Sequence, residues 1–306
     1  MVISKPLAAS ALILSIMCFA GNYLVGGIAA SSMPLMSLMY IKWGASAIPL
    51  LIFAHYFERP AWRSVLKSWP KILLLGSLGI AAYSFGLYQA LRTTSSPINA
   101  ALINAFNPAM IAVASAIFLR EKLSVIKVLG VLIGFLGVVW VLTGGQPALI
   151  LQQRLAIGDL WMLAVVASWT CYMVLYRVGP SLPPVTNAAL QMLFFTLAMT
   201  PFMLYEGISV PTSSAGTWSL VYIAIFPSAV AYSLWAIGSK TIEPGQAGQF
   251  LNLMVPFTAI GSLMMGKTVS APEIVGGALI LIGVYLASKQ ASSLAPEETT
   301  LVAKTN

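Results

Sequence analysis

Two asparagines and a proline interrupt a long apolar stretch of the chain, in the sequence NAFNPAM from Asn104 to Met110. A buried amide without a hydrogen-bond partner costs roughly 2–7 kcal/mol to move out of water. Pro108 has no N–H, so it leaves the carbonyl of Asn104 without its helical donor. Asn104, Asn107 and Pro108 therefore indicate a hydrogen-bonding site inside a membrane helix, where lipid offers no partner. The alternative is that the amides only join neighbouring helices and the proline is a tolerated kink.

The same arrangement returns later in the chain, in the sequence NLMVPFT from Asn252 to Thr258. An offset of 148 positions places Asn104 on Asn252 and Pro108 on Pro256. Pro256 likewise leaves the carbonyl of Asn252 without its donor. Further matches keep the same order: Ser124 with Ser270, Gly130 with Gly276, Gly137 with Gly283 and, at an offset of 150, Phe19 with Trp169. The matches predict an internal repeat in which Pro108 and Pro256 are paired candidate hinges.

Aromatic and small polar residues recur at helical spacing in four other apolar runs. Such side chains combine stacking surface with hydroxyl, amide and indole groups, which suits a flat substrate with a polar end. The alternatives are packing within a helix bundle and, near the ends of helices, aromatic belts at the membrane interface. The candidates for substrate binding are Phe19, Asn22, Tyr83, Trp169, Tyr172 and Tyr232.

Lys42 is the one basic residue deep inside an apolar run. A basic group at mid-helix costs roughly 2.5–3.5 kcal/mol on insertion scales, so it must pair or reach water. Lys42 is a candidate ligand for a substrate carboxylate. It is also a candidate for a structural role, in which it binds backbone carbonyls at helix ends.

The titratable residues argue against an enzyme. All eight acidic residues fall at the ends of apolar runs, in loops or in the C-terminal segment, and His55 is the single histidine. A catalytic or metal centre would need several such groups at one depth, whereas Cys18 and Cys171 lie in separate runs. The sequence therefore predicts no catalytic residue, no metal and no cofactor. Coupling of substrate movement to protons would have to use His55 or a less obvious group. We therefore expect that a substrate moves down its own gradient, without coupling to protons.

Composition identifies the elements that must position these side chains. The 306 residues are 59% hydrophobic and 8% charged, against about 25% charged in an average soluble domain. Runs long enough to cross a hydrocarbon core of about 30 Å predict ten transmembrane helices. We expect the first to be retained, because it is too long for the core of a signal peptide. The predicted helices cover residues 6–30, 33–56, 70–91, 97–118, 124–142, 158–178, 184–205, 216–239, 244–265 and 271–289.

The basic residues that give the chain its net charge of +8 are placed unevenly along it, and their positions indicate how the chain is oriented in the membrane. With the N-terminus inside, twelve basic residues fall in inside segments and three, Arg92, Arg154 and Lys267, in outside loops. This asymmetry follows the positive-inside rule and predicts a multi-pass protein with both termini in the cytoplasm. The expected partners are a small-molecule substrate and membrane lipids, and no nucleic acid.

Each predicted repeat has five helices, an odd number of membrane crossings. The second unit must therefore lie upside down in the membrane relative to the first. We therefore predict an all-α integral membrane protein with a first five-helix repeat at 1–145, a second, inverted repeat at 146–289, and a flexible cytoplasmic tail at 290–306. Inverted repeats are typical of transporters, whose substrate site lies near the membrane midplane between the halves.

The two five-helix units, the E-x-L-S and glycine-rich pattern from Glu121 to Gly137, and the proline-containing fourth helix resemble the EamA-type drug/metabolite transporter superfamily. The resemblance covers residues 7–289 and is greatest to the bacterial aromatic amino acid exporters of that group. Two positions depart from the family pattern: Lys42-Trp43 replaces Arg-Phe, and Lys267 stands where the first repeat has Glu121.

The resemblance implies a carrier of the bacterial inner membrane that exports amino acids, aromatic ones in particular, and related amphipathic metabolites. Ten helices can enclose a pathway in a monomer. Carriage of other metabolites or lipophilic drugs is the alternative within transport. A non-transporting membrane assembly protein is the alternative outside it, although such a protein would not need a polar, aromatic centre.

Overall fold

The computed structural model describes residues 4–93, 96–120, 124–146, 156–178, 180–239, 241–242 and 250–289. Throughout these ranges the regular structure is helical. The helices are α1 (Lys5–Ser32), α2 (Leu35–Phe57), α3 (Trp62–Lys67), α4 (Trp69–Gly76), η1 (Ser77–Ala82), α5 (Tyr83–Thr93), α6 (Pro97–Ala105), α7 (Asn107–Phe118), α8 (Val125–Leu142), α9 (Ile157–Arg177), α10 (Pro184–Glu206), α11 (Ser214–Ile225), η3 (Phe226–Val230), α12 (Ala231–Ser239), η4 (Leu251–Leu253), α14 (Met254–Met264) and α15 (Ala271–Lys289).

Eight helices of the described residues are long and apolar enough to cross a membrane. They coincide with the first eight predicted spans to within a few residues, which confirms a multi-pass membrane protein. Two shorter apolar helices, Leu251–Met264 and Ala271–Leu286, lie where the ninth and tenth spans were predicted. The predicted start of the ninth span, at residue 244, and the tail at 290–306 lie outside the described residues.

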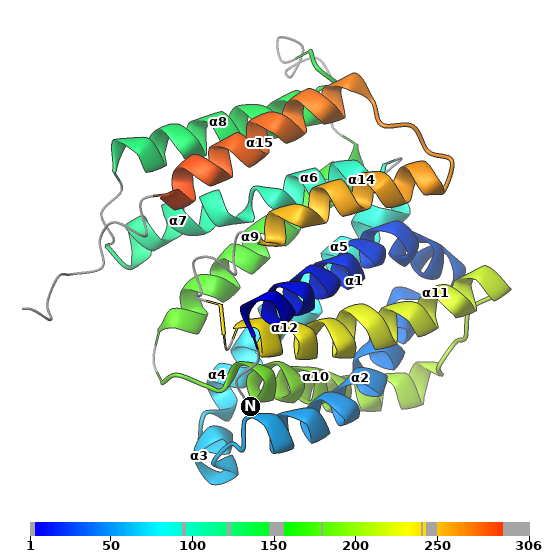
Figure 1. Ribbon diagram of the computed structural model, residues 1–306. Coiled ribbons are helices and arrows are strands. Elements are labelled where there is room, and N and C mark those ends of the chain that lie inside the picture. Colours follow the sequence, from blue (N-terminus) through cyan, green and yellow to red (C-terminus); the bar gives the residue numbers. More distant parts are fainter. Residues whose placement is uncertain are drawn as a thin grey trace, which may run out of the picture.

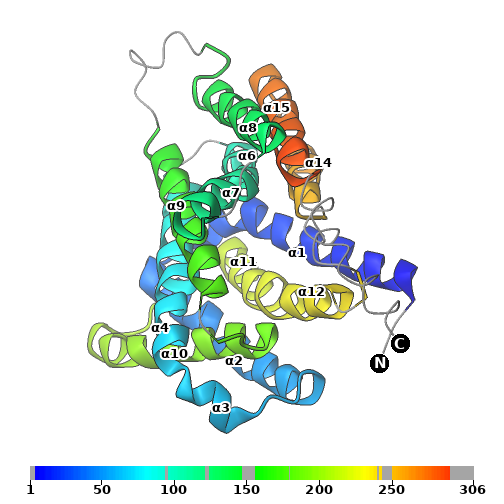
Figure 2. The ribbon, with the colours of Figure 1, turned by 90° about the vertical axis from the view of Figure 1, so that its left-hand side faces the viewer.

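The helices form a bundle in which segments far apart in sequence lie side by side. Helices α8 and α15 pack together along one edge, and α2 and α10 pack together along the opposite edge (Figures 1 and 2). Between them, α1 contacts α12 and α5 contacts α9. The central helices are therefore α1, α5, α9 and α12, which carry most of the predicted aromatic site.

Two membrane-spanning segments contain a π-helical turn near the middle. One is η1, between α4 and α5, and the other is η3, between α11 and α12. In η3, Pro227 supplies no backbone N–H, which accounts for a local change of helical pitch. A serine from a neighbouring helix binds a carbonyl at each place: Ser168 Oγ donates to Leu78 O at 3.0 Å, and Ser15 Oγ donates to Ala231 O at 2.8 Å. π-Helical turns often mark functional positions.

Glycines allow α8 and α15 to approach each other closely. A Cβ atom added to Gly137 would lie 2.7 Å from the carbonyl oxygen of Gly276, and one added to Gly283 would lie 2.7 Å from Gly134 Cα. Small residues at crossing points are a usual means of packing helices in membranes. The glycines predicted to be equivalent in the two repeats therefore meet at one interface.

Hydrogen bonds at both ends join α2 to α10. The Glu58 carboxylate accepts the N–H groups of Val185 at 2.9 Å and Thr186 at 2.7 Å, and so caps the N-terminus of α10. At the other end, Ser37 Oγ accepts the N–H of Ser209 at 3.2 Å. These bonds, with Gly44 facing Thr196 between them, fix the two helices as antiparallel neighbours.

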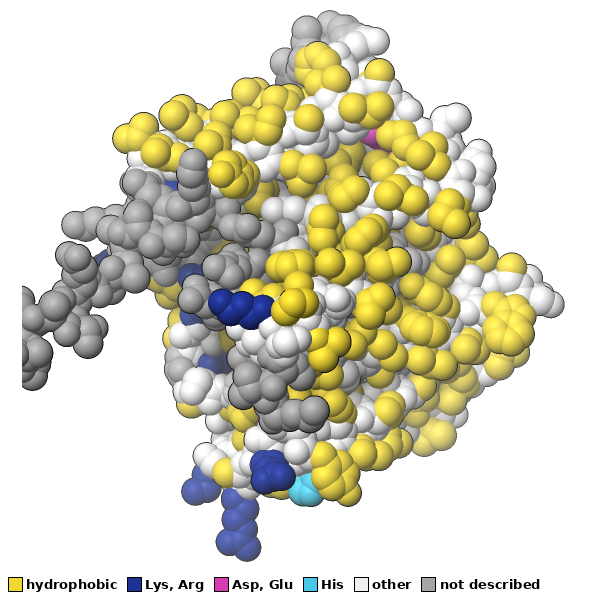
Figure 3. All heavy atoms as spheres, in the orientation of Figure 1, with side chains coloured by type: hydrophobic (Ala, Val, Ile, Leu, Met, Phe, Trp, Pro, Cys, Tyr) yellow, Lys and Arg dark blue, Asp and Glu magenta, His cyan; other side chains and the backbone are white. Residues whose placement is uncertain are grey.

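Large apolar side chains cover the outside of the bundle. They fill much of the face shown in Figure 3, where Lys and Arg side chains lie towards the left and lower margins. Leu136 on α8 is 60% exposed, Leu204 on α10 is 79% exposed and Trp218 on α11 is 73% exposed. So much exposed apolar surface is unfavourable in water and favourable in lipid.

The sequence suggested that the prolines of the repeated motif bend a continuous helix. In the structure each proline lies instead near the start of a new helix. Helix α6 ends at Ala105 and α7 begins at Asn107, so Pro108 lies in the first turn of a new helix. There its missing N–H breaks no helical bond. Pro256 lies similarly in the first turn of α14, directly after the short turn η4. The chain is thus interrupted, rather than kinked, beside both asparagines.

Candidate substrate pathway

A buried chain of hydrogen bonds holds Lys42. Its Nζ donates to the Tyr88 hydroxyl at 2.8 Å, and that hydroxyl donates to Asn22 Oδ1 at 2.9 Å. Nζ also lies 3.9 Å from the centre of the Trp43 ring, a cation–π geometry. Lys42 is only 4% exposed and Tyr88 is fully buried. The basic group is therefore paired with the Tyr88 phenol from α5 and the Trp43 indole from α2, rather than with the backbone carbonyls that the structural alternative required.

The predicted aromatic residues cluster where α1, α5, α9 and α12 meet. Phe19 contacts Tyr232 edge to face with ring centres 5.6 Å apart, and Tyr83 contacts Trp169 at 5.2 Å. Trp169 stacks on Tyr172 at 4.8 Å with the planes 20° apart. All five are partly exposed. The structure thus brings together residues separated by more than 200 positions and leaves each of them partly exposed.

The four helices place these rings because each helix turns one face inward. Tyr83 begins α5 directly after the π-helical turn η1, and Tyr232 lies next to the end of η3. Tyr232 contacts Phe19 on α1, and Tyr83 contacts Trp169 on α9. The two π-helical turns therefore adjoin the cluster.

The asparagines of the repeated motif lie at the interruptions described above. Asn107 Nδ2 donates to Asn104 Oδ1 at 2.8 Å, and Asn107 Oδ1 is buried with no hydrogen-bond partner among the described residues. Asn252 lies in η4 and is partly exposed. Helices α6 and α14 are in contact, but no hydrogen bond of the described residues joins Asn104 to Asn252.

Two polar residues of α10 were missed by the sequence reasoning. Asn187 and Gln191 are one turn apart and almost fully buried, and both carry side-chain atoms without a hydrogen-bond partner in the described part of the chain. Tyr88 was also missed. A signal existed for Gln191, since it follows Lys42 by 149 positions, within the range of offsets that relates the two predicted repeats.

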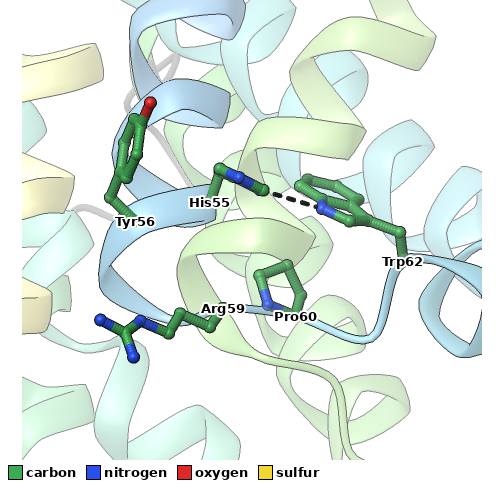
Figure 4. A pocket seen from close by; sticks show the side chains of 5 residues that line it. All are labelled: His55, Tyr56, Arg59, Pro60 and Trp62. Atoms are coloured by element: carbon green, nitrogen blue, oxygen red, sulfur yellow. Dashed lines mark hydrogen bonds between the residues drawn. The ribbon is translucent and has the colours of Figure 1, made fainter.

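Two cavities lie away from these residues. One, of about 320 Å³, is lined by His55, Tyr56, Arg59, Pro60 and Trp62 near the end of α2 (Figure 4). The other, of about 640 Å³, lies between the N-termini of α6 and α15 and includes Asn99, Lys267 and Glu273. None of the predicted substrate-binding residues lines either cavity.

His55 is occupied at the first of these cavities. Its Nδ1 accepts the Trp62 indole N–H at 3.2 Å, and Figure 4 shows the two rings facing each other while Arg59 points away. His55 follows Lys42 by 13 positions on α2, which is about 20 Å along a helix. The geometry gives the histidine a surface role in the observed structure, remote from the aromatic cluster.

The described residues form a helical bundle with an apolar outer surface and with aromatic and polar side chains at its centre, an arrangement typical of membrane transport proteins. The chain belongs to the EamA-like transporter family, whose model matches residues 6–143 and 156–289. Glu121, which contributes to the resemblance noted in the sequence, lies outside the described residues.

Individual relatives are similar over most of the chain. The uncharacterized transporter YyaM of Bacillus subtilis (strain 168) is 27% identical over 251 residues, 81% of this chain and 82% of that protein. A probable terminal-alkyne amino-acid exporter of Streptantibioticus cattleyicolor is 23% identical over 279 residues, 90% of this chain and 88% of that protein. A protein of known crystal structure shares the fold with a TM-score of 0.63 at 22% identity, covering 94% of this chain and 99% of that one.

Proposed function

We propose that the protein is a secondary transporter that exports amino acids, aromatic ones in particular, and related small amphipathic metabolites. The observation that carries the proposal is the aromatic cluster at the meeting point of α1, α5, α9 and α12, in a bundle that also buries Lys42. Aromatic faces bind a flat side chain, and an ammonium group beside them binds a carboxylate. The amino-acid exporter among the relatives supports the same class of substrate.

Alternating access between two inverted five-helix units is part of the proposal. The units are 1–145 and 146–289, and the family model matches one segment in each. The contacts support this arrangement, because α2 packs on α10 and α8 packs on α15, which would be equivalent helices. The pairs α5 with α9 and α12 with α1 would likewise be equivalent. Two similar units facing opposite ways give two openings of similar energy.

The protein would work in the bacterial inner membrane with both termini in the cytoplasm, as the positive-inside rule predicts. Substrate gradients would drive movement, since His55, the candidate for proton coupling, binds Trp62 at the end of α2. The candidate ligands are the five clustered rings and Asn22, Lys42, Asn104, Asn107 and Asn252, with Pro108 and Pro256 beside the moving joints.

Counterflow in proteoliposomes tests the proposal. Purified protein is reconstituted in vesicles loaded with one unlabelled amino acid, and uptake of labelled tryptophan, phenylalanine, leucine and glutamate is followed with and without a pH gradient. We expect the two aromatic amino acids to exchange fastest, independently of the pH gradient. Protein-free vesicles give the background.

Failure of every amino acid to exchange above that background would reject the substrate class. Faster exchange of leucine than of the aromatic pair would reject the aromatic preference alone. A gradient-dependent rate would reject uncoupled movement.

A further inference from the structure

Two buried amide side chains of α10 carry polar atoms that have no hydrogen-bond partner among the described residues. Asn187 is fully buried, and neither its amide nitrogen nor its amide oxygen has a hydrogen-bond partner among the described residues. Gln191 is 2% exposed, and its Nε2 is also without a partner in the described part of the chain. Unpaired polar groups in a dry interior oppose folding, so each instance calls for an explanation. Residues one turn apart share a helix face, which makes Asn187 and Gln191 one polar strip.

The strip lies beside the aromatic cluster. Gln191 packs against α4, where a Cβ added to Gly76 would lie 3.4 Å from Gln191 Cβ. Gly79, one turn further along the same span, faces Tyr172, because an added Cβ there would lie 2.8 Å from Tyr172 Cδ2. Tyr172 in turn stacks on Trp169. A substrate ring held by this stack would therefore bring its polar end within reach of α10.

Gln191 occupies the place in the second repeat that Lys42 occupies in the first. Gln191 follows Lys42 by 149 positions, and Tyr232 follows Tyr83 by the same number. Both side chains approach the span Trp69–Thr93, Lys42 at Tyr88 and Gln191 at Gly76. Gln191 therefore contacts the part of this span that precedes η1, and Lys42 contacts the part that follows it.

We propose that Asn187 and Gln191 form a second polar binding site of the pathway, which takes the ammonium and carboxylate groups of an α-amino acid on the side opposite Lys42. An amide suits a zwitterion, because its NH₂ donates to a carboxylate and its oxygen accepts from an ammonium. The inference rests on the proposed function, since it adds to Lys42 a second place in the pathway at which the polar end of the same substrate binds.

Apolar replacements of matching size test the site. We expect Asn187→Leu and Gln191→Met each to raise the half-saturating tryptophan concentration in counterflow about tenfold, the loss of a hydrogen bond to a charged group. The same variants should raise the thermal midpoint of the ligand-free protein by about 2 °C or more, because an unpaired buried group has been removed. Asn187→Ala is the second variant for counterflow in case the larger side chain prevents folding.

Thr196→Val is the matched control on the same helix. The Thr196 hydroxyl already donates to Met192 O at 2.8 Å, so its loss should leave the half-saturating concentration unchanged and should not raise the midpoint. Unchanged affinity in both amide variants would overturn the proposal, and so would a lower midpoint in both, which would reveal a structural role. If the unaltered protein exchanges no amino acid, the proposed function fails, and the midpoints alone then decide whether the strip is unpaired.

Discussion

Lys42 shows how a costly basic group is retained inside a membrane helix. Its ammonium is shared between the Tyr88 hydroxyl and the Trp43 ring, and Asn22 in turn binds Tyr88. Lys has three N–H donors, of which Tyr88 uses one. The remaining donors are what a substrate carboxylate needs. A paired and oriented ammonium is thus compatible with both a structural and a binding role, and substitutions at its neighbours separate the two.

Replacing Tyr88 with phenylalanine should destabilise the protein. Tyr88→Phe removes the hydroxyl that joins Lys42 to Asn22. It takes the donor from Asn22 Oδ1 and leaves the Lys42 ammonium with the Trp43 ring, at a cost of about 1–3 kcal/mol. Thermal unfolding in detergent measures the effect. Tyr40→Phe is the control, because the Tyr40 hydroxyl makes a single, longer contact of 3.3 Å with Thr200. Equal midpoints for the two variants would show that the network contributes no stability.

Trp169 should determine the affinity for aromatic substrates. Trp169→Leu removes the ring that stacks on Tyr172, and an aromatic contact is worth about 0.5–1.5 kcal/mol, or roughly two- to twelvefold in half-saturating concentration. Counterflow with tryptophan and leucine measures it, and we expect the loss for tryptophan only. Trp161→Leu, on the same helix but packed against Phe85, is the control. An equal loss in both variants would point to general damage to α9.

Interruptions and close approaches define how the helices can move. Helices α8 and α15 touch through glycines and form a tight pair, whereas α6 and α7 are separated at Phe106 and α14 follows a short turn. The π-helical turns η1 and η3 add two further irregular points. The tight pair suits a fixed element, and the irregular points suit joints.

A methyl group at Gly283 should separate α8 from α15. In Gly283→Ala the added carbon would lie within 2.7 Å of Gly134 Cα, and such overpacking costs about 1–3 kcal/mol. We expect a lower thermal midpoint in detergent. Gly76→Ala is the control, since its nearest neighbour would be 3.4 Å away. A Gly283→Ala variant as stable as that control would mean that the two helices are free to shift apart.

The interruptions beside the asparagines should be needed for rapid exchange. Pro108→Ala and Pro256→Ala each restore a backbone N–H and favour a continuous, stiffer helix. We expect slower counterflow in both variants with little change in the half-saturating concentration. Pro49→Ala, inside α2 and outside the repeated motif, serves as the comparison. Unchanged rates in both motif variants would count against a hinge role.

The molecule as a whole should cross the membrane with its basic segments inside. We expect a fluorescent protein fused after Asn306 to fold and fluoresce in the cytoplasm, and alkaline phosphatase fused after Gly145 to be active outside. The physical reason is the excess of Lys and Arg in the inside segments. Phosphatase activity from a fusion at the C-terminus, together with no activity from the fusion after Gly145, would show that the topology is the reverse of the predicted one.

The sequence located most of the fold because long apolar runs depend on local composition alone. The first eight spans match the helices closely, and the family relationship follows from the motifs spread along the chain. The repeated NAFNPAM and NLMVPFT segments also marked the interruptions beside Asn104 and Asn252. Their form was not predicted, because a proline is compatible with both a kink and a new helix, and neighbouring helices decide between them.

Contacts between distant residues needed the tertiary structure. Lys42 and Tyr88 are 46 positions apart, and Phe19 and Tyr232 lie at opposite ends of the chain. Asn187 and Gln191 become notable only when the described residues around them are seen to leave amide atoms of both side chains without a hydrogen-bond partner. Apolar length and charge asymmetry are sums over neighbouring residues, so the sequence alone located the first eight spans and predicts the topology. Pairing, burial and the absence of a partner depend on which helix faces lie together, and packing in three dimensions decided them.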